Sequence, residues 1–194
     1  EELMKEVMET RVCNDEDSLV FVCSAVLHAW AESDISDAAQ RAETILSRML
    51  ERGIKLDATC FGAVVAAYAK AGRGLEAEAV FRRLQNLYRS TGDETVKPST
   101  VEYNALISAW TNQGDAEKAE AILREMQQLQ MIGEGIQPDI LTFNTVISAL
   151  ASSRSPSAAQ KAESLLQEMQ QLDMEGRVNI KPDVVSFTSV INAW

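Results

Sequence analysis

The sequence has few of the residues on which catalytic and metal sites depend. Histidine occurs once, at His28, so a triad that needs histidine would have to use this residue, and no Gly-x-Ser-x-Gly motif accompanies it. The three cysteines, Cys13, Cys23 and Cys60, are odd in number and lack the spacing of metal ligands. We therefore expect no enzymatic activity, no cofactor, no bound metal and no small-molecule substrate. The odd number of cysteines also favours an intracellular protein with reduced thiols.

Aromatic residues, glycine, proline and long apolar runs are also scarce. Aromatic residues make up 6% of the 194 residues, beside nine glycines and four prolines, which disfavours a turn-rich all-β fold. No apolar run approaches the roughly 18 residues of a membrane-spanning helix, so we expect no membrane partner. Hydrophobic residues account for 46% and charged residues for 24% of the sequence, which is typical of a folded chain.

Internal repetition with a period of about forty residues dominates the sequence instead. Five similar apolar segments begin at residues 20, 58, 100, 140 and 184. A second pattern, Ala-Glu-x-apolar-apolar-x-x-Met/Leu, lies between them at residues 42–49, 77–84, 119–126 and 162–169. Both patterns place apolar residues at i, i+3, i+4 and i+7, as an amphipathic helix does. Two helices per repeat predict an all-α fold, a right-handed α-solenoid of stacked helix-turn-helix repeats.

These patterns divide the chain into repeats. Residues 1–19 are interpreted as a linker that follows the tail of a preceding repeat, with residues 1–8 as the end of its second helix. The others are repeat 1 (20–57), repeat 2 (58–99), repeat 3 (100–139), repeat 4 (140–183) and the first helix of a truncated repeat 5 (184–194). Because the chain begins with Glu1 and stops within an apolar pattern, we interpret it as a fragment of a longer array, whose missing targeting signals carry no information.

Prolines and helix-capping residues lie where such repeats need them. Pro98, Pro138 and Pro182 each precede an expected first helix by two residues. The residues directly before the first helices are suited to cap them, because a side-chain oxygen can accept a free backbone N–H; they are Asp57, Ser99, Asp139 and Asp183. Extra residues at 86–96, 130–137 and 172–180 are expected to lengthen the second helices or the loops after them.

Several of these segments together resemble pentatricopeptide repeats. The resemblance rests on Val101–Trp110, Ala119–Met126 and Gly135–Asp139, and on Leu141–Ile147 and Ile180–Asp183 in the next repeat. It covers about residues 20 to 194, although the repeat spacing exceeds the family's usual unit, which we attribute to the extra residues. The tetratricopeptide pattern fits less well. The resemblance implies recognition of single-stranded RNA, one base per repeat, along a concave face made by the first helices.

The resemblance also implies which side chains would read the bases. Two residues per repeat do so in the family: one follows the aromatic residue early in the first helix, and the other ends the repeat. The pairs here are Ser24 with Asp57, Gly62 with Ser99, Asn104 with Asp139, and Asn144 with Asp183, while Thr188 has no partner in the chain. By analogy the Asn/Asp pairs prefer uracil and the Ser/Asp pair prefers guanine, whereas Gly62 is permissive or silent. An amide offers both a donor and an acceptor to a base edge.

A further residue of each repeat is expected to pack against the base plane; these residues are Phe21, Thr59, Val101, Leu141 and Val185. Lys70 is the one residue at the family's phosphate-binding position. Other interpretations remain open: the carboxylates and Ser99 as caps alone, and the apolar residues as inter-repeat core. The three tryptophans, Trp30, Trp110 and Trp194, are expected in the core.

The net charge opposes general nucleic-acid binding, because phosphate attraction normally dominates affinity. Eighteen basic residues stand against 29 acidic ones, for a formal charge of −11. Within the five first-helix segments, however, the only acids are Glu32 and Glu102. The other acids belong to second helices and loops, which a solenoid places mostly on its convex side and edges. We therefore expect a nearly neutral groove and weak RNA binding by this chain alone.

Sequence-specific binding of single-stranded RNA is thus the leading hypothesis. The resemblance adds mitochondrial or plastid (chloroplast) RNA metabolism as the setting, by processing, stabilisation, editing or translation. The alternative is an α-solenoid scaffold that binds other proteins and no RNA, and a third is a stretch that only spaces active repeats. The recurring Asn/Asp pair favours RNA, because a peptide-binding solenoid has no reason to keep it.

Overall fold

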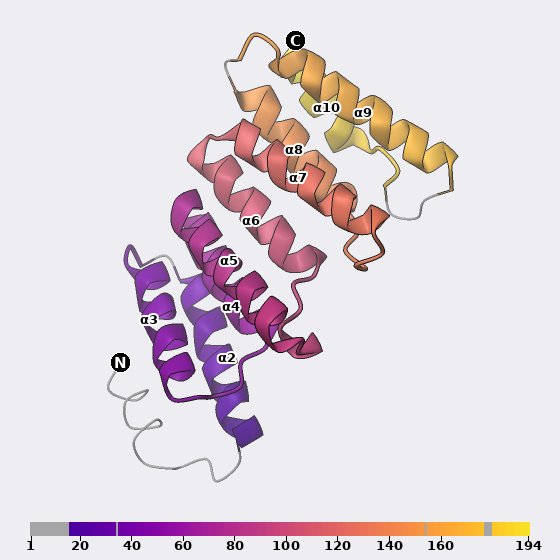
Figure 1. Cartoon of the computed structure of the whole chain (residues 1–194). Helices are drawn as coiled ribbons and strands as arrows, with labels where there is room; N and C mark the ends of the chain where they lie inside the picture. Colours follow the sequence, from indigo (N-terminus) through magenta and orange to yellow (C-terminus); the bar gives the residue numbers. More distant parts are fainter. Residues whose placement is uncertain (1–15, 34, 154, 177–179) are drawn as a thin grey trace.

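The structure, a computed structural model, describes residues 16–33, 35–153, 155–176 and 180–194. In this part of the chain every regular element is helical (Figure 1). The α-helices are α2 (Glu16–Glu32), α3 (Ala38–Glu51), α4 (Ala58–Lys70), α5 (Gly74–Thr91), α6 (Thr100–Gln113), α7 (Ala116–Met131), α8 (Ile140–Ser152), α9 (Ala158–Met174) and α10 (Val184–Ala193), and a short 3-10 helix, η1, covers Glu94–Val96. The predicted all-α class is confirmed.

The helices form two layers of a curved stack (Figure 1). The even-numbered helices are the first helices of the repeats, and each packs against the first helix of the next repeat. The second helices, α3, α5, α7 and α9, instead pack mainly against the first helices on either side of them. Because the first helices lie closer together than the second helices, the stack curves with the first helices on its inner face. The predicted α-solenoid is confirmed.

Four first helices begin where the sequence predicts. The helices α4, α6, α8 and α10 start directly after their capping residues, and each cap's side chain accepts a backbone N–H from the first turn. Helix α2 differs, because it already includes Glu16, ahead of residue 20. The apolar pattern marks the face that a helix buries and not its first turn. The expected helical tail at residues 1–8 lies outside the described residues, and the repeat boundaries remain a division made from the sequence.

The extra residues after each second helix divide between helix and loop. Helices α5, α7 and α9 continue to Thr91, Met131 and Met174, so each takes up part of its insertion. The following loops are held by one buried apolar residue that precedes the proline by two positions; these residues are Val96, Ile136 and Ile180. Each insertion therefore leaves the repeat-to-repeat packing intact.

The tryptophans differ in their burial. Trp110 is buried against the start of α5, where a Cβ on Gly74 would lie 2.7 Å from the ring atom Cε3. A side chain at position 74 would therefore push the ring away. Trp30 is partly exposed, and the expectation of a core position is wrong for Trp194, which is 72% exposed. No described helix packs over this side of α10.

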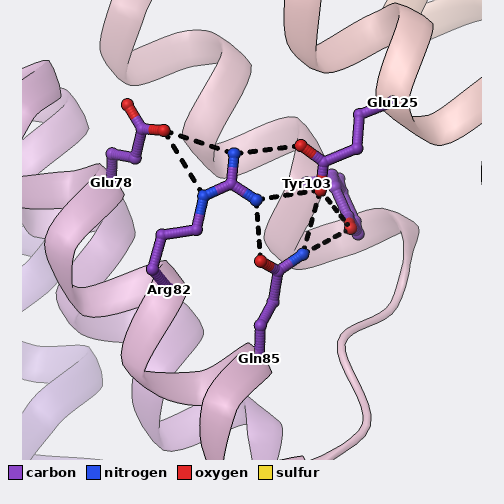
Figure 2. Close-up of polar contacts among 5 residues, drawn as sticks. All are labelled: Glu78, Arg82, Gln85, Tyr103 and Glu125. Carbon is purple, nitrogen blue, oxygen red and sulfur yellow. Dashed lines mark hydrogen bonds and ion pairs between the residues drawn. The ribbon is translucent and has the colours of Figure 1, made fainter. Parts of the chain in front are cut away.

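A polar network joins the wider-spaced second helices (Figure 2). Arg82 on α5 donates hydrogen bonds to both carboxylate oxygens of Glu125 on α7, each over 2.9 Å, and also contacts Glu78. Gln85 and the hydroxyl of Tyr103 donate to the same carboxylate over 3.0 Å. Burial raises the pKa of Glu125, but the hydrogen bonds from Arg82 and Gln85 outweigh it and hold that pKa below its ordinary value.

The same kind of ion pair recurs one repeat later. Arg124 on α7 donates to Glu168 on α9 over 2.8 Å, so long side chains bridge the outer layer where the helix backbones are too far apart to pack. None of the described helices is both long enough and apolar enough to cross a membrane.

Candidate nucleic-acid interface

The structure brings Asn104 and Asp139 together at the junction of repeats 3 and 4. Asn104 Nδ2 donates to the Asp139 carboxylate, with distances of 3.2 Å to Oδ1 and 3.4 Å to Oδ2. The hydroxyl of Thr142, the third residue of α8, lies 2.7 Å from Asn104 Oδ1 and 2.8 Å from Asp139 Oδ1. Asp139 also accepts the backbone N–H of Thr142 over 2.8 Å, so it caps α8 at the same time.

An equivalent group forms at the next junction. Asn144 Nδ2 donates to Asp183 Oδ1 over 3.1 Å, and the Ser186 hydroxyl lies 2.6 Å from Asn144 Oδ1. The hydrogen bond from the Ser186 backbone, together with those from Asn144 and the Ser186 hydroxyl, lowers the pKa of Asp183 below its ordinary value. This carboxylate is therefore ionised at neutral pH.

We call each group of amide, carboxylate and hydroxyl a rung. Its contacts orient the amide, because the hydroxyl lies beside the oxygen and the carboxylate accepts from the nitrogen. An amide nitrogen carries two hydrogens and an amide oxygen has two lone pairs. Each asparagine uses one hydrogen and one lone pair within its rung, so one donor position and one acceptor position remain available on each asparagine. Asn104 and Asn144 are both partly exposed. A rung can therefore present a donor and an acceptor, in fixed order, to a ligand in the groove.

The third residues of α8 and α10 complete the two rungs, and the sequence reasoning missed them. Thr142 and Ser186 are fully buried hydroxyl residues. Their hydroxyls also accept the backbone N–H of the preceding aspartate, which is the capping-box arrangement. The signal in the sequence is the polar residue three positions after each cap, which is Thr or Ser where the preceding repeat carries Asn.

The pair expected in repeat 1 is not joined in the structure. The Ser24 hydroxyl donates to the backbone oxygen of Phe21 over 2.9 Å, within its own helix. Asp57 accepts from the Thr59 hydroxyl over 2.7 Å and from the Cys60 backbone over 3.0 Å. Burial raises the pKa of Asp57, yet these hydrogen bonds outweigh it and the pKa lies below its ordinary value. Along the described ranges, no hydrogen bond links Ser24 to Asp57.

The pair expected in repeat 2, Gly62 with Ser99, lies beside Glu102 instead of a hydroxyl residue. Ser99 caps α6 and donates its hydroxyl to Glu102 over 2.7 Å, and Glu102 also accepts the Ser99 backbone N–H over 2.8 Å. Glu102 occupies the same helix position as Thr142 and Ser186, and its side chain lies over Gly62. Repeat 2 therefore has the Glu102 carboxylate in the place where repeats 3 and 4 have an asparagine amide and a hydroxyl.

The residues expected to pack against bases are exposed. Thr59 is exposed, and the exposed fractions of the four apolar residues exceed one half: 73% for Phe21, 69% for Val101, 58% for Leu141 and 54% for Val185. The interpretation of Phe21, Val101 and Leu141 as inter-repeat core is therefore wrong. An apolar side chain that recurs at one exposed position of successive repeats is available to cover a flat ligand.

Lys70 lies at the end of α4, beside the end of α2. Its ammonium nitrogen donates to the backbone oxygen of Glu32 over 2.8 Å. One repeat later, Asn112 Nδ2 makes the corresponding contact with the backbone oxygen of Ala69 over 2.9 Å. Both side chains therefore satisfy the last carbonyl groups of a preceding first helix. Thr188 is exposed on α10.

The thiols and carboxylates do not assemble into a metal site within the described residues. Cys23 and Cys60 are both buried, and Cys13 lies outside the described part. Burial, followed by the hydrogen bond with Asp57, raises the pKa of Cys60 to about 12, so this thiol is protonated at neutral pH. Of the two acids in the predicted first-helix segments, Glu32 is exposed and Glu102 is buried. Helix α2 extends ahead of its predicted segment and therefore also contains Glu16 and Asp17.

The curved stack of helix pairs, with its recurring polar rungs, places the chain in the class of helical-repeat proteins. Two family models match the chain: one described as PPR repeat matches residues 59–87 and 141–174, and one described as pentatricopeptide repeat domain matches residues 86–153. These matches together extend over residues 59–174. The chain belongs to the pentatricopeptide repeat family, as the sequence resemblance indicated.

Solved structures of this family share the fold. The crystal structure of the pentatricopeptide repeat protein PPR10 in complex with an 18-nt psaJ RNA element matches with a TM-score of 0.67 and 22% identity, over 97% of this chain and 24% of that chain. The structure of PPR10 from maize matches with a TM-score of 0.68 and 21% identity, over 97% of this chain and 23% of that chain. The chain thus spans about a quarter of the length of these structures. No curated protein matches the sequence.

Proposed function

We propose that this chain is a non-catalytic binding protein that recognises single-stranded RNA in a sequence-specific way, one base per repeat. The observation that carries the proposal is the recurrence of the rung, with Asn104, Asp139 and Thr142 at one junction and Asn144, Asp183 and Ser186 at the next. One of the matched PPR10 structures holds an RNA element, which agrees with this function.

The rung has the chemistry to select uracil. Uracil presents an N–H donor beside a carbonyl acceptor, and an amide pairs with both when its own acceptor and donor are in matching order. Cytosine presents an acceptor beside a donor, so it needs the amide turned over. The hydroxyl at Asn104 Oδ1 and the carboxylate at Nδ2 oppose that turn. Repeats 3 and 4 therefore prefer two consecutive uracils.

The exposed apolar residues hold the bases in place. A base read by Asn104 lies between Val101 and Leu141, and a base read by Asn144 lies between Leu141 and Val185. Covering these side chains with a base removes apolar surface from water and stabilises the complex. In repeat 1, Ser24 and Asp57 select guanine, with Phe21 and Thr59 beside the base, and Lys70 approaches a phosphate.

The setting we propose is organellar RNA metabolism, in mitochondria or plastids, where such binding protects, processes, edits or regulates the translation of a transcript. Thr188 begins a fifth reading position on α10.

Selection from a random RNA pool tests the function, with a single-stranded DNA pool as the control. We expect enrichment of RNAs with two adjacent uracils and much weaker enrichment of DNA. Binding of RNA without any base preference would contradict the proposal. Absence of binding at RNA concentrations up to 100-fold above the protein concentration would contradict it too. The latter result favours the protein-binding scaffold.

A further inference from the structure

Repeat 2 differs from repeats 3 and 4 at two positions that touch each other. Its first helix carries Gly62 where the others carry Asn104 and Asn144, and the helix after it carries Glu102 where the others carry Thr142 and Ser186. Each of these two positions belongs to a different helix, α4 for Gly62 and α6 for Glu102. The pair of residues has therefore changed on both sides of one contact.

Glu102 fills the space that a reading side chain needs. A Cβ on Gly62 would lie 3.0 Å from Glu102 Oε1 and 3.3 Å from Glu102 Cγ, which is closer than carbon contacts normally allow. The other carboxylate oxygen, Oε2, accepts two hydrogen bonds from Ser99, so the side chain is anchored there. Glu102 is only 3% exposed, although glutamate is rarely buried to this degree. The side chain is held over Gly62 and offers almost no surface to the groove.

On the basis of the function proposed above, we propose that Glu102 is a specificity-determining residue that closes the reading position of repeat 2. Its side chain takes the volume of the missing asparagine, so repeat 2 spaces the RNA by one nucleotide without selecting a base. The absence of selection then depends on Glu102 and not only on the lack of a side chain at Gly62. Placing asparagine at position 62 is insufficient to restore reading while the glutamate, or a residue of its size, stays.

Thermal melting tests the contact without RNA. We expect Gly62→Asn to lower the melting temperature by about 5 °C, because the new side chain overpacks against Glu102. Glu102→Thr keeps a hydroxyl that can accept the Ser99 N–H, as Thr142 does for Asp139. The melting temperature of the double variant Gly62→Asn/Glu102→Thr should then be several degrees higher than the value obtained by adding the two single-variant shifts. Additive shifts in melting temperature would overturn the proposal.

Base selection tests the consequence with a matched pair of variants. Gly62→Asn/Ser99→Asp/Glu102→Thr copies the complete rung, and Gly62→Asn/Ser99→Asp/Glu102→Gln differs from it only by keeping the volume of Glu102 without its charge. We expect a preference of about tenfold for uracil opposite repeat 2 in the threonine variant and none in the glutamine variant or the unchanged chain. Equal uracil preference in the two triple variants would overturn the proposal.

The bases opposite Asn104 and Asn144 are the internal reference. If uracil is preferred at these two positions in every variant but is never preferred opposite repeat 2, the role proposed for Glu102 is contradicted and the proposed function stands. If no variant shows uracil preference at any repeat, the proposed function fails and the role of Glu102 in specificity fails with it.

Discussion

Asn104 Nδ2 lies 3.2 Å from Asp139 Oδ1, although 35 residues separate the two in the sequence. Asp139 also accepts the backbone N–H of Thr142 and so begins α8. One carboxylate therefore ends one repeat, caps the first helix of the next and orients an amide of the preceding first helix, α6. Capping and base reading, which are alternatives for this residue in the sequence, are compatible in the structure.

Replacing both Asn104 and Asn144 by serine should change the preferred base without unfolding the chain. Serine cannot present a donor and an acceptor side by side, so we expect about a tenfold loss of uracil preference at each position and a shift towards guanine. RNA selection measures the preference, and circular dichroism measures the fold. Asn112→Ser is the matched control, because Asn112 contacts a backbone oxygen of α4 and belongs to no rung. Retained uracil preference in the double variant would defeat the assignment.

Thr142→Val should weaken both the helix start and the rung. Valine has the same shape but neither donates towards Asn104 Oδ1 nor accepts the Asp139 N–H, and the site is fully buried. We expect the free energy of unfolding to fall by roughly 1–2 kcal/mol and uracil preference at repeat 3 to decrease, because the amide can turn over.

Chemical denaturation and RNA selection measure these two effects. Thr145→Val is the control, since the Thr145 hydroxyl bonds only to Leu141 O within α8, over 2.8 Å. Unchanged selectivity at repeat 3 after Thr142→Val would show that the hydroxyl does not orient the amide.

Arg82→Met should destabilise the outer layer and leave RNA selectivity unchanged. The substitution removes the guanidinium that contacts both oxygens of the half-buried Glu125 (Figure 2). We expect a loss of roughly 1–2 kcal/mol in unfolding free energy, limited by the partial exposure of both side chains, and a rise in the pKa of Glu125.

The double variant Arg82→Met/Glu125→Met should lose less stability than the two single losses added together, as measured by denaturation. Arg83→Met is the control, because Arg83 reaches its nearest carboxylate, Glu43, only over 3.7 Å. An equal loss from both arginine substitutions would contradict a special role for Arg82.

The melting temperature should be nearly constant from about pH 5 to 8 and should fall below about pH 4. The pKa values of Asp57 and Asp183 are lowered in the folded chain from an ordinary value of 3.8. A lowered folded pKa means that the stabilisation is complete above the ordinary value and is lost as the pH falls through the folded value.

Asp183→Asn keeps a capping side chain without the titration, so we expect it to reduce the acid-side decline. Melting curves at several pH values measure this. A decline between pH 7 and 5 in the unchanged chain, or an unaltered acid-side decline in the variant, would show that these carboxylates do not control acid stability.

The sequence by itself determined the helices, their order and the starts of four first helices. A cap such as Asp139 and a proline such as Pro138 act on backbone groups within a few residues, and apolar spacing identifies the face that a helix buries. The pairing of Asn104 with Asp139 was implied by the resemblance to pentatricopeptide repeats, and not by these local signals. Helix α2 already includes Glu16, ahead of the apolar segment that begins at residue 20, since the buried face alone does not mark the first turn.

Only the tertiary structure decided which side chains from successive repeats meet. Glu102 lies over Gly62, Arg82 reaches Glu125, and Ser24 turns back to its own helix instead of towards Asp57. Contacts between repeats join residues about forty positions apart, and they depend on how two helices stack. The stacking distance sets which side-chain volumes fit and which donors reach an acceptor, and a one-dimensional pattern does not contain that distance.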